Sequence, residues 1–177
     1  MKSINVLVCA TYLAMFFGTI SVANGAIFTP AGATFTTSFG STITLKTPSS
    51  FGAAVTCNVQ LSGKVRPDGS AIDIGNAWIS GSNPLCMLSG MFSVPGMLMP
   101  PFSVFGSNGT LINIGYTITG APPIIPNSNC GLNTIFVTLA NAPGNGGVSL
   151  DANNQSLSGT CTIVSFNTSF PGISIAP

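Results

Sequence analysis

Hydrophobic and polar residues alternate over much of the chain, and this period of two predicts β-strands. The pattern is clearest in residues 55–65, where one face carries Val55, Cys57, Val59, Leu61 and Val65. Residues 66–69 (RPDG) are typical turn residues, because proline fixes its φ angle and glycine adopts conformations closed to other residues. Residues 71–74 are then expected to return as the partner strand, with a β-bulge at Gly75 before Trp78.

Further segments show the same alternation, and the turn residues Asn108 and Gly109 precede one of them. That segment, 111–119, is expected to bury Ile112, Ile114, Tyr116 and Ile118. No segment has the periodicity of a helix. Strands separated by Gly, Pro and Asn clusters predict an all-β, antiparallel β-sandwich or open barrel. The additional predicted strands are 41–47, 134–139, 148–150 and 161–166.

The first 25 residues have the three parts of a secretory signal peptide. Lys2 precedes an apolar run, and small residues follow it, so that cleavage fits after Ala23 or after Gly25. A membrane anchor is the alternative, but no basic residue follows the apolar run to stop transfer. We therefore expect a secreted, extracellular protein whose mature chain, 26–177, is one β domain without a transmembrane span.

Removal of the signal peptide leaves four cysteines in an exported chain, and an even number indicates two disulfides. Four cysteines allow three connectivities, of which we favour Cys57–Cys86 and Cys130–Cys161, because each pair encloses a segment of similar length. Zinc binding is the alternative use, but the chain has no CxxC spacing and no histidine. We therefore expect these cysteines to stabilise the fold and expect no metal site.

Charge is scarce: 4% of the residues are charged, the formal net charge is +1, and histidine is absent. Nucleic acid is not an expected partner, since so few basic residues cannot neutralise a phosphate backbone. A catalytic triad lacks its base. A pair of carboxylates, Asp73 and Asp151, is the remaining basis for a glycosidase, because Asp68 lies in a predicted turn. The sequence thus predicts a non-enzymatic protein without a cofactor.

The segment 85–105 is uncharged and rich in methionine and proline, and we refer to it as the Met/Pro-rich segment. Its prolines exclude a regular strand or helix across its whole length. Three interpretations are open: a buried crossover, an apolar surface for alkane, lipid or another subunit, and a thioether site for Cu(I). The candidate residues for an apolar surface are Met87, Met91, Phe92, Met97, Leu98, Met99 and Phe102.

Several stretches resemble the secreted PraB-type proteins, which are known as activators of alkane oxidation. The resemblance is carried by residues 55–65 (VTCNVQLSGKV), 69–71 (GSA), 77–86 (AWISGSNPLC), 130–131 (CG) and 153–161 (NNQSLSGTC). Two features depart from the pattern. The Met/Pro-rich segment replaces a short Leu-Pro-Trp element after the second cysteine, and the chain continues beyond Cys161 with residues 167–177.

The resemblance implies a secreted, all-β bacterial protein that makes poorly soluble alkane available, without an established catalytic residue. Its expected partner is a hydrocarbon or another apolar surface. A first alternative is a structural subunit of a matrix, fibre or surface layer, in which neutral β-rich chains with apolar ends such as 166–177 self-associate. A second alternative is a polysaccharide-binding module that uses Trp78, Tyr116 or exposed Asn and Thr residues.

Overall fold

A computed structural model describes residues 25–37, 40–90, 96–101, 107–143 and 146–177. The predicted signal peptide lies outside these residues, apart from Gly25. Nearly all the regular structure is β-strand: β1 (Ile27–Thr29), β2 (Thr34–Thr36), β3 (Thr42–Lys46), β4 (Ala54–Val65), β5 (Ile72–Ser80), β6 (Ser89–Gly90), β7 (Gly96–Met99), β8 (Asn108–Ile118), β9 (Ser128–Asn141), β10 (Val148–Leu157), β11 (Cys161–Phe170) and β12 (Ser174–Ala176). Two short helices accompany them, the 3-10 helix η1 (Pro48–Ser50) and α1 (Pro84–Met87).

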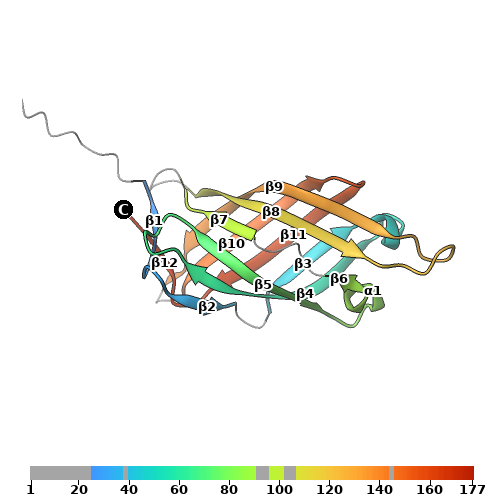
Figure 1. Cartoon of the computed structure of the whole chain (residues 1–177), viewed down its shortest axis with the longest axis horizontal. Helices are drawn as coiled ribbons and strands as arrows, with labels where there is room; N and C mark the ends of the chain where they lie inside the picture. Colours follow the sequence, from blue (N-terminus) through green and yellow to red (C-terminus); the bar gives the residue numbers. More distant parts are fainter. Residues whose placement is uncertain (1–24, 38–39, 91–95, 102–106, 144–145) are drawn as a thin grey trace, which may run out of the picture.

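The main sheet closes on itself. Antiparallel pairing runs in the order β4-β3-β11-β10-β9-β8-β7-β5, and β5 pairs back onto β4, so that eight strands form a barrel (Figure 1). The expected class, all-β and antiparallel, is confirmed, whereas neither the sandwich nor the open barrel describes the sheet. The physical reason is the length of β4, whose twelve residues pair with β3 and β2 along one edge and with β5 along the other.

Apolar side chains fill the barrel, as is usual for barrels of about eight strands. The alternating residues predicted for β4 and β9 point inward, and all of them are buried except Val55, which is half-buried. The largest fully buried side chains on the barrel strands are Ile43, Ile72, Leu98, Ile135, Leu139, Leu150, Ile163, Phe166 and Phe170. The interior is therefore a packed core, and functional contacts have to be sought on the outer walls or at the two ends.

The two ends of the barrel differ in construction. At one end, on the left in Figure 1, β1 pairs with β12 as a separate two-stranded sheet, beside the turn between β4 and β5. The side chain of Asn141 fastens β12 to β9 through two hydrogen bonds with the backbone of Ile175. At the other end lie η1, α1 and the connection between β8 and β9.

The predicted bulge at Gly75 is confirmed. Ser62 pairs with Asn76 and Gly63 pairs with Ile74, which leaves Gly75 as the extra residue of β5. Ile72 and Ile74 are buried before the bulge, and Ala77 is buried after it. Because the extra residue shifts the alternation by one position, Trp78 points to the outside of the barrel instead of into the core.

Other details of the prediction are wrong. Asn108 and Gly109 begin β8 rather than a turn, and Gly109 is so close to Leu139 that a Cβ atom would lie 2.6 Å from its Cδ1. A second irregularity follows between Leu111 and Ile114. It moves Leu111 into the core in place of Ile112, which is half-buried.

Both predicted disulfides are present, Cys57–Cys86 and Cys130–Cys161, with sequence separations of 29 and 31 residues. Each joins segments that strand pairing alone would not hold together. The first attaches α1 to β4, and the second joins the beginning of β9 to the beginning of β11. None of the helices in the described ranges has the length and apolar character needed to cross a membrane.

Candidate functional site: an apolar barrel end opposite a charged end

The Met/Pro-rich segment contains regular structure that its prolines do not interrupt. Helix α1 begins at Pro84, a position where the missing N–H costs nothing, and the side chain of Asn83 accepts a hydrogen bond from the N–H of Leu85 at 2.9 Å. Strand β7 lies between Pro95 and Pro100 and pairs with β5 and β8. In its described residues the segment thus carries short elements and not one strand or helix across its whole length, as expected.

The predicted apolar-surface residues have different environments. Met87 is exposed, whereas Met97 and Met99 are half-buried. Leu98 is fully buried in the barrel core, so its assignment to a surface was wrong: on β7 it alternates with Met97 and Met99 and faces the interior. The remaining candidates, Met91, Phe92 and Phe102, lie outside the described residues.

Three segments that carry exposed apolar side chains lie at the same end of the barrel: the end of η1, the end of α1 and the β8–β9 connection (Figure 1). Their exposed fractions are 75% for Phe51, 77% for Met87, 44% for Leu88 and 77% for Ile124. Single exposed apolar residues are ordinary on protein surfaces, but several at one end of a small barrel are not. We refer to Phe51, Met87, Leu88 and Ile124 as the apolar end.

Specific bonds hold these three segments beside one another. The hydroxyl of Ser49 in η1 donates to the carbonyl oxygen of Pro126 at 2.6 Å and lies 2.6 Å from the hydroxyl of Ser128, which fixes Phe51 near the β8–β9 connection. Ser89, directly after Leu88, pairs with Ile118 of β8. Sequence analysis did not find Phe51 and Ile124, because they lie far from Met87 along the chain and only the fold places their segments at the same end of the barrel.

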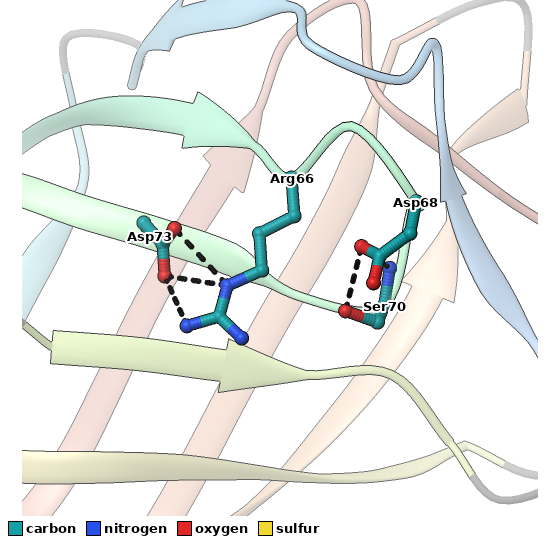
Figure 2. Close-up of polar contacts among 4 residues, drawn as sticks. All are labelled: Arg66, Asp68, Ser70 and Asp73. Atoms are coloured by element: carbon teal, nitrogen blue, oxygen red, sulfur yellow. Dashed lines mark hydrogen bonds and ion pairs between the residues drawn. The ribbon is translucent and has the colours of Figure 1, made fainter.

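The opposite end of the barrel carries charge (Figure 2). Arg66 and Asp73 form an ion pair at 3.0 Å, and the Nε of Arg66 donates to both carboxylate oxygens of Asp73. Hydrogen bonds from the N–H and the hydroxyl of Ser70 hold the pKa of Asp68 below its ordinary value, since they stabilise the carboxylate. Hydrogen bonding and attraction by Asp73 raise the pKa of Arg66.

Of the remaining charged residues that the structure describes, Lys46 ends β3 on the side of η1, so the apolar end is not free of charge. Lys64 lies near the charged end, opposite Asp73. Asp151 lies on β10, where it accepts a hydrogen bond from the side-chain amide of Asn167. The barrel is thus amphipathic along its length, with most of its charge concentrated away from the apolar end.

The carboxylate pair considered for a glycosidase does not form. Asp73 is on β5 and Asp151 is on β10, and three strands separate β5 from β10 in either direction around the barrel. Both side chains alternate with buried neighbours and therefore face outward, on opposite walls. Within the described ranges, no three His, Cys, Asp or Glu residues come together as a metal site would require.

These features define a class: an all-β barrel closed by antiparallel pairing, cross-linked by two disulfides and unequal in polarity at its two ends. A family model described as alkane oxidation protein activator PraA/PraB-like matches residues 1–177. The chain therefore belongs to this family, which confirms the resemblance seen in the sequence. Its description is that of an activator rather than of an enzyme. Comparisons with curated proteins and with solved structures gave no match.

Proposed function

We propose that this family member is a secreted, non-enzymatic activator of alkane oxidation that contacts hydrocarbon through its apolar end. The observation that carries the proposal is the exposure of Phe51, Met87, Leu88 and Ile124 at one end of a barrel whose other end is charged. A molecule with this polarity gains free energy at an oil–water interface, where the apolar side chains leave water while the charged end remains hydrated.

Secretion is supported by the signal-like N-terminus and by the two disulfides, which persist in oxidising compartments. The disulfide Cys57–Cys86 also supports the apolar end, because the buried Cys86 directly precedes the exposed Met87. It anchors the short helix to β4 while Met87 and Leu88 stay exposed. A rigid, preformed apolar surface does not have to be ordered when it adsorbs, which lowers the entropic cost of binding.

The matrix or fibre alternative relied on free strand edges and on the apolar C-terminal residues. In the described part of the chain, the eight barrel strands pair into a closed ring, which removes the long edges needed for edge-to-edge assembly. Phe166, Phe170 and Ile173 are buried, and β12 pairs with β1. The features that favoured self-association are therefore used within the chain, and we retain the hydrocarbon interface as the proposal.

The test measures adsorption of the purified, oxidised protein to hexadecane droplets. We expect the double variant Met87→Ser/Ile124→Ser to adsorb at least about tenfold more weakly, since burying each exposed apolar side chain contributes about 1.5–3 kcal/mol. Both side chains are 77% exposed, so the fold should be unaffected. The matched control is Leu132→Ser/Phe136→Ser, which removes two exposed apolar side chains from the barrel wall.

The control should adsorb like the unmodified protein if the apolar end makes the contact. Equal weakening of both double variants would show that general hydrophobicity, rather than this end, drives adsorption. Adsorption no stronger than that of a neutral β-sandwich of similar size would remove hydrocarbon contact from the function.

A further inference from the structure

Trp78 lies on the outer wall of the barrel, apart from the apolar end, and it is 72% exposed. It is the only tryptophan of the sequence. A large aromatic ring on a wall otherwise built from polar residues leaves apolar surface exposed to water. Such a ring offers a face on which a ligand can pack. The bulge at Gly75 places the ring there, as described above, because an unbroken strand would direct position 78 into the core.

Polar, uncharged side chains border the ring on the side of β4. Gln60 lies directly opposite Trp78 in the pairing of β4 with β5, and Asn58 lies opposite Ser80. Directly opposed residues of an antiparallel pair have Cβ atoms about 4.5–5.5 Å apart, so these side chains border the ring. Together with Gly40 and Ser41 they line an open groove of about 540 Å³, a volume within the usual range of small-molecule sites.

The amides of this groove are free to bind a ligand. Among the described residues, the side chains of Asn58, Gln60 and Ser80 make no hydrogen bond to the protein. Each amide offers donors and an acceptor, and the hydroxyl offers both. An aromatic face beside such groups is complementary to a sugar ring, whose C–H groups pack on the ring face while its hydroxyl groups exchange hydrogen bonds with the amides.

Charge favours a neutral sugar over an acidic one. On the outer face of β4, the nearest charged residue beyond Gln60 is Lys64, four positions along the strand and therefore about 13 Å away. Lys64 itself lies opposite Asp73. A polyuronate would therefore find no adjacent cation, whereas a neutral sugar needs none. Bare hydrocarbon fits poorly, because it would bury the amides without giving them partners.

A second exposed aromatic residue provides a comparison on another wall. Phe136 is 71% exposed on β9 and also lies beside an amide, Gln155. That amide is already occupied: its oxygen accepts the N–H of Phe136 at 3.1 Å, and its nitrogen donates to the carbonyl oxygen of Asn153 at 2.8 Å. The two walls differ in the amide directly beside the ring, which is bonded to the backbone at Gln155 and free at Gln60, and in the carboxylate of Asp151, which lines the hollow beside Phe136.

We infer that the groove formed by Trp78, Gln60, Asn58 and Ser80 binds a neutral polysaccharide, with the sugar ring packed on Trp78. This site uses other residues than the proposed hydrocarbon contact, since it is formed by β4, β5 and the segment before β3. Its Asn58 and Ser80 border α1, which the disulfide Cys57–Cys86 fastens to β4. The protein would then combine a sugar-binding wall with an apolar end. Tyr116, the other aromatic residue considered for sugar binding, is buried and takes no part.

The test titrates the purified, oxidised full chain with hydroxyethyl cellulose, laminarin, mannan and dextran. Because Trp78 is the only tryptophan, its fluorescence reports directly on the groove. We expect at least one of these polysaccharides to change the fluorescence saturably and to bind in calorimetry. Gln60→Ala should weaken that binding about three- to tenfold, since a net hydrogen bond contributes about 0.5–1.5 kcal/mol.

Trp78→Ala should weaken binding at least about tenfold in calorimetry, by analogy with base stacking on aromatic side chains. Trp78→Tyr should restore part of the affinity. Phe136→Ala is the matched control and should bind normally, and Trp78→Ala should keep full adsorption to hexadecane.

In the sugar-binding experiments, any of three results would overturn the inference. These are no binding of any of the four polysaccharides, equal weakening of binding by Phe136→Ala, and stronger binding of alginate than of every neutral polysaccharide. Loss of hexadecane adsorption by Trp78→Ala would also overturn it, because Trp78 would then belong to the hydrocarbon contact. Failure of the hydrocarbon proposal alone, with sugar binding intact, leaves this inference standing.

Discussion

At the scale of single residues, the bulge between β4 and β5 determines where Trp78 points, and it contains one glycine on each strand. Gly75 is the extra residue in β5, and Gly63 on β4 pairs with Ile74 directly before it. At Gly63 a Cβ atom would lie 2.0 Å from the carbonyl oxygen of Asp73, whereas at Gly75 the nearest atom would be 3.9 Å away. Only Gly63 is therefore required by the close approach of two backbones.

This contrast gives a prediction for two alanine substitutions at one bulge. Gly63→Ala should lower the free energy of unfolding by about 1–3 kcal/mol, because the new methyl group forces the strands apart. Gly75→Ala should change it by no more than about 0.5 kcal/mol. Chemical denaturation followed by Trp78 fluorescence measures both. Equal effects would contradict the assignment of the close contact to Gly63.

At the scale of elements, the two disulfides enclose loops of nearly equal length but hold different parts of the barrel. Cys57–Cys86 fastens α1, which carries Met87, whereas Cys130–Cys161 joins the beginnings of β9 and β11, close to the β8–β9 connection. Loop lengths of 29 and 31 residues predict almost the same entropic stabilisation. A functional difference between them would therefore come from what each one holds in place.

We expect Cys57→Ala/Cys86→Ala and Cys130→Ala/Cys161→Ala each to lose about 3–4 kcal/mol of stability, as the chain-entropy model gives for loops of this size. The first variant should also lose hexadecane adsorption, because α1 is no longer anchored to β4. The second should lose less adsorption at a temperature where both remain folded, because α1 keeps its anchor and only the β8–β9 connection loses a nearby cross-link. Unfolding curves and droplet adsorption test this, and normal adsorption by the first variant would separate α1 from the hydrocarbon contact.

At the scale of the whole molecule, the distribution of polarity matters more than the net charge. The formal net charge is +1, and the Arg66–Asp73 ion pair and Asp68 lie at the end away from Phe51, Met87 and Ile124. Adsorption of such a molecule to oil is driven by burial of its apolar surface, and salt does not screen this driving force.

Adsorption to hexadecane should therefore not weaken when salt is raised from about 0.01 M to 1 M, although the Debye length falls from about 30 Å to about 3 Å over that range. Droplet binding isotherms at both concentrations measure this. A severalfold decrease at high salt would indicate that Lys46, Lys64 or Arg66 drives adsorption, and would count against the apolar end.

The sequence by itself determined the class of the fold and the family, because these depend on local signals. It favoured the correct disulfide pairing among three, which the structure then established. Alternation with period two identified the strand at 55–65, and the bulge at Gly75 could be located from its glycine. The Asn-rich second half of β10, residues 153–157, carried too few apolar residues to reveal a strand. The irregularity between Leu111 and Ile114 limits the predicted alternation to the residues after it. Ile114, Tyr116 and Ile118 are buried as expected, whereas before the irregularity Leu111 faces the core instead of Ile112.

Only the tertiary structure decided which residues share a surface. The sequence predicts the hairpin of β4 and β5, but closure of the barrel also needs β5 to pair with β7 and β11 to pair with β3, and such long-range pairing leaves no local mark in the sequence. The same closure separates Asp73 from Asp151, places the segments of Phe51 and Ile124 at the end with α1, and buries Leu98. A surface is formed by segments distant along the chain, so residue type indicated which side chains could contribute and the fold determined which of them do.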